Sequence, residues 1–152
     1  MNQVFADRVG RVQQLFDDLD RRNVLPLVGT IYPEIPAVYV FVELGKPVHV
    51  GRTSKLRQRI RGHRDKSHYS ATFAFKEARR LTNNLRATYK AKGSRTYLMQ
   101  DPDFRAEFDR QIRRVTELGV KYLEVEDAID QYLLELYAAL EYQTSLTEFE
   151  NH

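Results

Sequence analysis

The chain has 152 residues, the length of one ordinary domain with its own hydrophobic core. Hydrophobic residues make up 42% and charged residues 30%, which is typical of a folded globular protein. The sequence contains no cysteine, which excludes disulfides, thiolate metal sites and cysteine nucleophiles. No apolar run predicts a membrane span or a signal peptide, so we expect a cytoplasmic protein that does not enter the membrane.

The net charge of +3 conceals a strong asymmetry along the chain. Residues 51–100 contain 14 Lys/Arg and two acids, which gives 14 − 2 = +12, so the remainder sums to 3 − 12 = −9. Residues 123–150 carry eight acids and no Lys or Arg. A basic middle segment of this kind favours a polyanionic partner such as nucleic acid, although charge segregation on a solvated surface is an alternative.

The N-terminal half of the chain predicts a helix, a connector and a β-hairpin. The helix covers about 3–21, with an apolar stripe of Phe5, Val9, Val12, Phe16 and Leu19. A proline-rich connector follows, and then two strands over 38–43 and 47–51. If the loop between the strands has three residues, 44–46, Tyr39 pairs with Gly51 and Tyr39 and His49 share one face. A two-residue loop would separate them.

The second half predicts four helices and a third strand. One helix runs from an N-cap at Thr53 to about Arg64, and another lies within 67–85. Asp101-Pro102 begins a helix that ends near Gly119, and the strand follows over 120–125. Asp127 caps a final helix, whose stripe is Ile129, Tyr132, Leu133, Leu136, Tyr137 and Leu140. The chain therefore reads as one α+β domain.

An arginine and a histidine lie on an apolar helix face. Leu56, Arg59, Ile60 and His63 occupy positions i, i+3, i+4 and i+7 of the helix after the hairpin, so they share one side. Lys55, Arg57 and Arg61 lie largely opposite. Arg59 and His63 are therefore aimed toward the sheet, as functional side chains would be. The alternative is that Arg59 extends outward past its neighbours and His63 is a boundary histidine.

These residues form a longer pattern that resembles the GIY-YIG nuclease family. The family's Gly-Ile-Tyr corresponds to Ala37-Val38-Tyr39, and its Tyr-Ile-Gly corresponds to His49-Val50-Gly51. The family then places a threonine two residues after that glycine, an arginine eight after it and a histidine four later. The matching residues are Thr53, Arg59 and His63. A glutamate on a late helix and an asparagine twelve residues on correspond to Glu135 and Thr147.

The resemblance implies a fold and an activity. The fold is a small three-stranded antiparallel sheet flanked by helices, here one domain over 1–152 with an N-terminal helix over 3–21 and a basic helical insertion over about 65–114. The activity is hydrolysis of DNA phosphodiester bonds by an endonuclease that requires Mg²⁺ or Mn²⁺. The chain differs from the family pattern at three positions, Ala37, His49 and Thr147, which stand where the family has glycine, tyrosine and asparagine.

The resemblance also assigns roles to individual residues. Glu135 is the metal ligand, and Tyr39 is the general base or the group that orients the attacking water. A guanidinium suits a phosphate, and Arg59 supplies it. His49 and His63 carry a proton or hold a phosphate, and both assignments stay open. Gly51, Thr53 and Thr147 are supporting residues.

The remaining cations predict contacts with the nucleic-acid backbone. They are Arg52, Lys55, Arg57, Arg61, Arg64 and Lys66. The insertion adds further cations interleaved with Tyr89 and Tyr97, where substrate selection or an ordinary solvated surface are both possible. We expect DNA as the partner, with RNA as an alternative and with monomer and homodimer both open. The competing interpretation is a nucleic-acid-binding module on the same fold without catalysis, while an unrelated small-molecule enzyme explains neither the +12 charge nor Arg59.

Overall fold

The structure, a computed structural model, describes all residues except 85–93, 147–148 and 150–152. The described chain divides into two compact units. Unit 1 comprises Met1–Arg57 and the described residues of Leu118–Glu150, and unit 2 comprises Gln58–Glu117. No helix in the described part of the chain is both long enough and apolar enough to cross a membrane.

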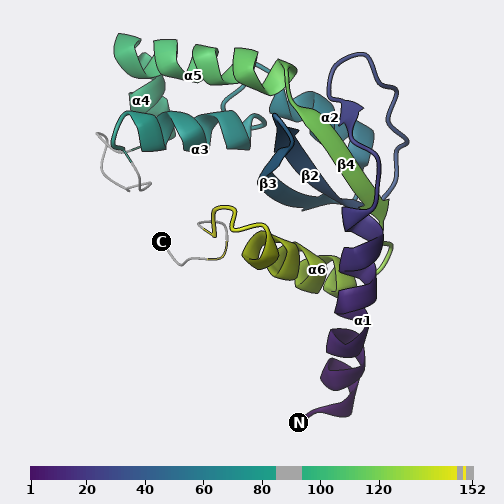
Figure 1. Cartoon of the computed structure of the whole chain (residues 1–152). Coiled ribbons are helices and arrows are strands. Elements are labelled where there is room, and N and C mark those ends of the chain that lie inside the picture. Colours follow the sequence, from purple (N-terminus) through teal and green to yellow (C-terminus); the bar gives the residue numbers. More distant parts are fainter. Residues whose placement is uncertain (85–93, 147–148, 150–152) are drawn as a thin grey trace. The chain divides into compact units, whose positions relative to one another are not determined.

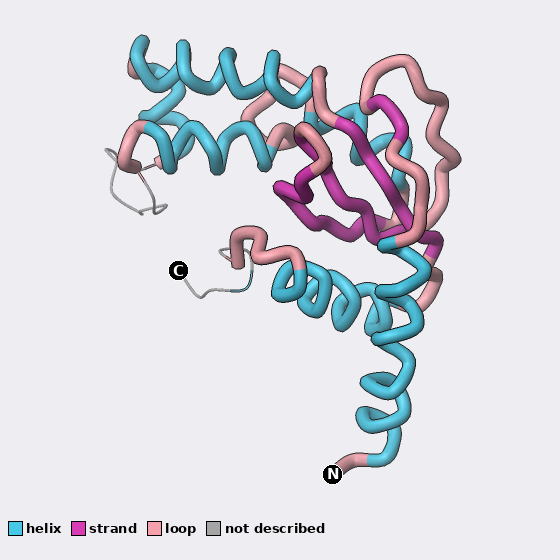
Figure 2. The backbone as a smooth tube through the Cα atoms, in the orientation of Figure 1, coloured by secondary structure: helices cyan, strands magenta, loops and turns pink. Residues whose placement is uncertain are grey.

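Unit 1 contains an antiparallel sheet (Figure 2) that has four strands in the described residues, in the order β1-β4-β2-β3. Their bounds are β1 Leu25–Pro26, β2 Ala37–Glu43, β3 Lys46–Thr53 and β4 Gly119–Glu124. The sequence predicts an α+β fold with an antiparallel sheet, which is confirmed, but three strands are one too few. The additional strand β1 lies at an edge and has only two residues, because Pro26 has no N–H to donate to a longer ladder.

The β2–β3 hairpin reaches the expected register by an unexpected route. Tyr39 pairs with Gly51 and Phe41 with His49, as predicted. The turn, however, has two residues, Leu44 and Gly45, with φ of 51° and 80°, since Glu43 pairs with Lys46. A β-bulge between the Phe41 and Val42 pairs leaves Val48 without a partner and shifts the register by one residue. The bulge therefore restores the pairing that a two-residue loop alone would remove.

One face of the sheet is covered by α1 (Gln3–Asp20) and α6 (Ala128–Glu141), as Figure 1 shows. Alternate residues of β2 point to this face and pack with Val50 and Leu123 in the core of unit 1. Phe16 and Leu19 of α1 and Leu134 and Ala138 of α6 complete that core. The N-terminal part of the predicted α1 stripe does not reach it, because Phe5 and Val9 are 50% and 45% exposed.

Helix α6 is rotated relative to the sequence prediction. Four residues of its predicted apolar stripe are exposed: Ile129, Tyr132, Leu136 and Leu140. The buried side instead consists of Gln131, Leu134, Glu135, Ala138 and Ala139. The small side chains of Ala138 and Ala139 allow close packing on the sheet, and Gln131 and Glu135 lie on the same buried side of the helix. Apolar residues occur on all sides of this helix, so their spacing could not indicate which side faces the core.

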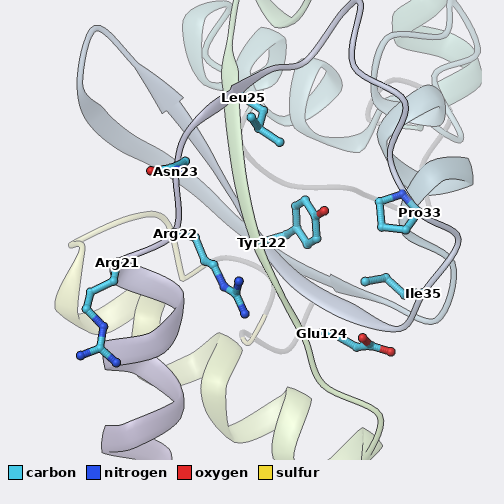
Figure 3. Close-up of a pocket in the computed structure, with 8 residues that line it drawn as sticks. All are labelled: Arg21, Arg22, Asn23, Leu25, Pro33, Ile35, Tyr122 and Glu124. Atoms are coloured by element: carbon cyan, nitrogen blue, oxygen red, sulfur yellow. The ribbon is translucent and has the colours of Figure 1, made fainter.

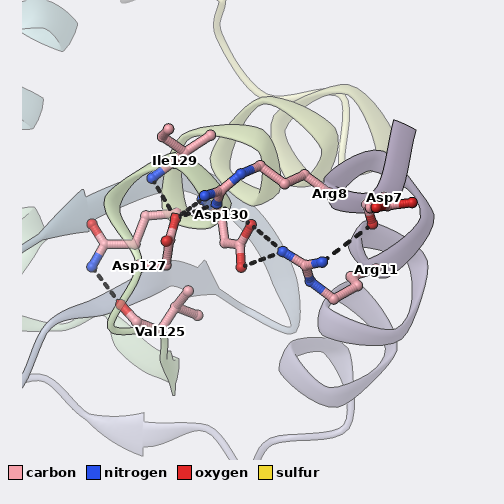
Figure 4. A network of polar contacts seen from close by, with 8 residues as sticks. Asp7, Arg8, Arg11, Val125, Asp127, Ile129 and Asp130 are labelled. Carbon is pink, nitrogen blue, oxygen red and sulfur yellow. Dashed lines mark hydrogen bonds and ion pairs between the residues drawn. The ribbon is translucent and has the colours of Figure 1, made fainter. Parts of the chain in front are cut away.

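An ion-pair network joins the N-terminal ends of α1 and α6 (Figure 4). Arg8 Nη1 lies 2.6 Å from Asp127 and 3.0 Å from Asp130, and Arg11 reaches Asp130 at 3.3 Å. Asp127 also caps α6, because its carboxylate accepts from the backbone N–H groups of Ile129 and Asp130. The Asp130 N–H and the Arg8 guanidinium together lower the pKa of Asp127.

Unit 2 is helical in its described part. Helix α2 (Leu56–His63) enters it and is followed by α3 (Thr72–Leu81), α4 (Arg95–Gln100) and α5 (Pro102–Thr116). The helix predicted within 67–85 begins only at Thr72, and α5 begins as predicted, with the Asp101 carboxylate accepting from the Asp103 N–H. Phe75 packs against Phe104 and Phe108 at ring-centroid distances of 5.2 and 6.1 Å.

Several cations of the insertion have structural roles inside unit 2. The Arg79 and Arg95 guanidinium groups lie over the Phe75 ring, at 5.0 and 4.7 Å from its centroid. Glu77 accepts from Arg80 and Arg114. Burial acts to raise the pKa of Glu77, but these two guanidinium groups outweigh it and the pKa is lowered. The cations of the insertion are therefore only partly available to a polyanion.

Candidate active site

Tyr39, His49 and Gly51 lie together on the face of the sheet opposite to α1 and α6. The strand register places Gly51 directly opposite Tyr39, and the Tyr39 ring covers the Gly51 Cα, where a Cβ would collide with its Cζ and Oη atoms. The Tyr39 and His49 ring centroids are 6.0 Å apart, and Phe41 lies 5.2 Å from His49. Tyr39 is 1% exposed and His49 4%, so both rings are held in a packed environment.

Glu135 lies on the buried side of α6, facing the sheet. It is 7% exposed, and one carboxylate oxygen is 3.7 Å from Arg52 Nε. The Arg52 guanidinium also stacks on the Tyr132 ring, 4.2 Å from its centroid. Arg52 pairs with Val38 and therefore points to the α6 face of the sheet, not to the face of Tyr39. Arg52 thus contacts the predicted metal ligand, which the sequence prediction of a simple phosphate contact did not include.

Gln131 is a buried polar residue of this region that the sequence prediction missed. Its Nε2 donates to the backbone oxygens of Val125 at 2.6 Å and of Thr53 at 3.3 Å. It therefore connects α6 to the end of β3 and to the residue after β4. Asp127, Gln131 and Glu135 recur every fourth residue, and this polar line on one helix side was the signal that could have revealed it.

Thr53 is not the N-cap of α2. β3 continues through Thr53, which still pairs with Ala37, and α2 begins three residues later at Leu56. The Thr53 hydroxyl accepts from the Lys55 N–H at 3.0 Å and stabilises the turn between strand and helix. The other supporting residue, Thr147, lies outside the described residues.

Along α2 the burial follows the predicted face. Leu56, Ile60 and His63 are 0%, 3% and 0% exposed, and Arg59 is half-buried. Arg59 and His63 belong to unit 2, where Arg59 makes two hydrogen bonds across the α2–α3 connection. Its Nη1 donates to the Ser70 carbonyl at 3.0 Å and its Nη2 to the Thr72 hydroxyl at 2.6 Å. Arg59 thus holds the start of α3 against α2.

The electrostatic environment of His63 favours a neutral imidazole. Complete burial lowers the pKa of His63 well below its ordinary value, and the positive charges of Arg59 and Lys76 lower it further. A neutral imidazole can accept a proton or a hydrogen bond, whereas a permanent cation at this position would require solvation that the site does not offer.

The predicted backbone-binding cations differ in their availability. Lys55, Arg61, Arg64 and Lys66 are exposed. Arg57 is also exposed, but its Nε donates to the Tyr32 carbonyl at 2.7 Å, which anchors the proline-rich connector. In the insertion, Tyr97 is 42% exposed, whereas Tyr89 and three of the basic residues, Arg86, Lys90 and Lys92, lie outside the described residues.

The donor chemistry at Glu135 fits a hard divalent cation. A buried carboxylate supplies the oxygen ligands that Mg²⁺ prefers, and magnesium commonly binds through one carboxylate together with substrate and water oxygens. In the part of the chain that the structure describes, no group of three or more His, Cys, Asp or Glu residues converges as a potential metal site. A metal at Glu135 would therefore rely on ligands from the substrate and from water.

Comparisons with known proteins give no assignment: no family model, no curated protein and no solved structure matches this chain.

Proposed function

We propose that the protein is a metal-dependent endonuclease of the GIY-YIG type that hydrolyses phosphodiester bonds of DNA. The observation that carries the proposal is the close approach of Tyr39 to Gly51. The sequence resemblance singles out these two positions on separate strands, and the register brings them face to face with the His49 ring beside them. A glycine opposite the tyrosine lets the ring lie over the partner strand, and a tyrosine fixed in one orientation suits catalysis.

Unit 1 holds two groups of the proposed reaction on opposite faces of the sheet, Tyr39 with His49 on one face and Glu135 of α6 on the other. Tyr39 orients the attacking water or takes its proton, and His49 lies beside it as the neighbouring ring. Glu135 would hold Mg²⁺ or Mn²⁺, which when bound neutralises charge on the phosphate and the leaving oxygen. Arg52 keeps the Glu135 carboxylate partnered in its buried position.

Arg59 and His63 enter the proposal through the sequence resemblance. A guanidinium can form two parallel hydrogen bonds to a phosphate, and a neutral imidazole can receive a proton from a reacting group. Burial and the lowered pKa of His63 support this state of the imidazole. The exposed cations Lys55, Arg61, Arg64 and Lys66 would bind the DNA backbone and determine affinity more than sequence preference.

A second candidate function is nucleic-acid binding without catalysis. The contacts of Arg59 favour it, because a guanidinium that already donates to Ser70 and Thr72 must release or share these bonds to hold a phosphate. Such a module would keep the basic surface and lose the reaction. The two functions differ in their dependence on a divalent cation.

Nicking of supercoiled plasmid tests the proposal directly. The wild-type protein is incubated with plasmid in magnesium, in manganese and in chelator, and DNA binding is measured in parallel at several salt concentrations. Magnesium-dependent nicking that chelator abolishes supports the endonuclease. Salt-sensitive binding with no nicking of plasmid, linear duplex or RNA under any metal would support the binding module instead.

A further inference from the structure

A cavity of about 530 Å³ lies in unit 1 at the outer edge of β4 (Figure 3). Cavities of this size are typical of small-molecule sites. Its lining comes from the C-terminal end of α1, from β1, from the proline-rich connector and from β4. The residues are Arg21, Arg22, Asn23, Leu25, Pro33, Ile35, Tyr122 and Glu124. None of them belongs to the candidate active site.

The cavity exists because β1 covers the edge of β4 only briefly. Leu25 and Pro26 pair with Val120 and Gly119, and this ladder has no further pairs. The residues before Leu25 run past the next part of β4 without pairing, so Arg22 and Asn23 form one wall. The connector returns on the other side and contributes Pro33 and Ile35. In Figure 3 the Tyr122 ring lies between these two walls.

Hydrogen bonds hold the connector wall in place. The Tyr32 hydroxyl and the Thr30 hydroxyl both donate to the Pro26 carbonyl at 2.7 Å. Burial raises the pKa of Tyr32 to about 12, so its phenol remains a hydrogen-bond donor at neutral pH. The Tyr32 ring also packs edge-on against Tyr122, at 5.9 Å between centroids, and fixes the orientation of the ring that faces the cavity. The site is therefore formed before any ligand arrives.

The cavity contains polar groups that the fold does not use. Within the described part of the chain, the Arg22 guanidinium, the Glu124 carboxylate and the Tyr122 hydroxyl form no hydrogen bond or ion pair with another side chain or with the backbone. Arg21, by contrast, is paired with Asp18 at 2.6 Å. The positive Arg22 and the negative Glu124 thus line the same cavity without contacting each other. This arrangement suits a ligand that has an anionic group at one end and a hydrogen-bond donor at the other.

We propose that this cavity binds a single nucleotide whose base carries an amino group. Tyr122 stacks on the base with Pro33 and Ile35 at its edges, Arg22 binds the phosphate, and Glu124 accepts from the amino edge of the base. Guanine offers two adjacent donors to a carboxylate and is the preferred base, whereas thymine presents no amino group. The nucleotide is either free in solution or part of a DNA strand from which it has been unstacked.

The experiment is a titration of the full chain with dGMP, dTMP and deoxyguanosine. Single-stranded dT oligonucleotides with and without one dG are titrated in the same way. Binding is measured by calorimetry and by the NMR shifts of Tyr122. The variants are Arg22→Gln, Glu124→Gln and Tyr122→Leu. Arg113→Gln and Glu126→Gln are matched controls, because both residues are exposed and neither lines the cavity. Thermal unfolding of every variant shows whether it is folded.

We expect dGMP to bind about tenfold more tightly than dTMP and than deoxyguanosine. Arg22→Gln should weaken dGMP without affecting deoxyguanosine, and Glu124→Gln should remove the preference for guanine. Binding of dGMP as tight as that of the oligonucleotide identifies a free nucleotide as the ligand, and binding of the dG-containing oligonucleotide alone identifies an unstacked nucleotide of a strand. Equal affinity of the folded variants and the controls, or no saturable binding of any probe, would overturn the proposal.

Discussion

The ring of Tyr39 occupies the space that a side chain on Gly51 would need. We therefore expect Gly51→Ala to force the Tyr39 ring aside, to lower the free energy of unfolding by about 1–3 kcal/mol and to abolish nicking. The backbone of Gly51 is in an ordinary extended strand, so the effect comes from the collision and not from backbone strain. Urea unfolding and plasmid nicking measure the two consequences separately.

Gly10→Ala is the matched control for this substitution. Gly10 lies inside α1 and a Cβ there would meet no atom within 4 Å. Because alanine has the higher helix propensity, Gly10→Ala should raise the free energy of unfolding by about 0.5–1 kcal/mol and leave nicking unchanged. If Gly51→Ala behaved like Gly10→Ala, the close approach of Tyr39 would not matter to the fold or to the reaction.

Arg59→Ala separates a role in the reaction from a role in the fold when it is compared with Thr72→Val. We expect Arg59→Ala to reduce nicking at least about 100-fold while DNA affinity changes only slightly, since the exposed cations remain. Thr72→Val removes the acceptor of Arg59 Nη2 and keeps the guanidinium, so its nicking rate should stay within about threefold of wild type. Equal losses in both variants would mean that Arg59 acts by holding α3 against α2.

Glu135→Gln keeps the shape of a buried side chain and removes its charge. We expect a folded protein with no magnesium-dependent nicking, because the amide is a poor ligand for a hard cation. In the presence of DNA, magnesium titration followed by the intrinsic tyrosine fluorescence should lose its saturable phase in the same variant. Glu141→Gln, on the exposed C-terminal turn of α6, is the control. Nicking that persisted in Glu135→Gln would remove Glu135 from the metal site.

Because His63 is buried as a neutral imidazole, we expect the free energy of unfolding to fall in mild acid. Burial and the charges of Arg59 and Lys76 lower the pKa of His63 in the folded state, so the unfolded chain binds a proton where the folded chain does not. The stability is fully present above about pH 6.5 and falls as the pH drops below that value. Carboxylates titrate below about pH 4–5 and contribute later. Urea unfolding at several pH values should show this slope, and His63→Gln should flatten it.

His68→Gln tests whether that slope belongs to His63. Burial and the charges of Arg95 and Arg105 also lower the pKa of His68, but this side chain is only partly buried. We expect its substitution to change the slope less than His63→Gln does. A larger change in His68→Gln would assign the acid sensitivity to the α3–α4 side of unit 2.

Lys55 and Arg52 should differ in what they contribute to a DNA complex. Lys55 is exposed, so Lys55→Ala should reduce the magnitude of the negative slope of log affinity against log salt concentration by about one. The nicking rate at saturating DNA should stay unchanged. Arg52→Ala should in addition lower the nicking rate, because it removes the partner of Glu135 at 3.7 Å. Parallel losses in the two variants would make Arg52 an ordinary backbone contact.

The local alternation of residues predicted which side chains of β2 share a face of the sheet. Valines on one face and Tyr39 and Phe41 on the other determine which side chains share a surface, and the structure has that arrangement and that register. The spacing on α2 likewise predicted the burial of Leu56, Ile60 and His63. In both elements one side is clearly more apolar than the other. The repeat of 2 residues in the strand and of 3.6 residues in the helix can therefore be recognised in the sequence.

The parts that the sequence could not predict lack such a contrast. In α6 apolar residues surround the helix, and the side that faces the sheet was decided by the small size of Ala138 and Ala139, with Gln131 and Glu135 beside them. In the hairpin the turn was one residue shorter than expected, because Leu44 adopts a positive φ that nothing in its side chain favours. The cavity at β4 depends on where β1 stops pairing, which is a property of distant segments and not of local spacing.

The bulge at Val48 sets the register in which the two strands of the hairpin pair. On the turn side of the bulge Val42 pairs with Pro47, and on the other side Phe41 pairs with His49. Because Val48 is left out of the ladder, His49 and Gly51 lie on the same face of the sheet as Tyr39. Deleting Val48 would remove the bulge and leave a regular hairpin in which His49 still pairs with Phe41 and Gly51 with Tyr39. A ladder that kept Val48 and paired it with Phe41 would instead turn His49 and Gly51 to the other face, so what keeps the two halves of the motif together is that residue 48 stays outside the ladder.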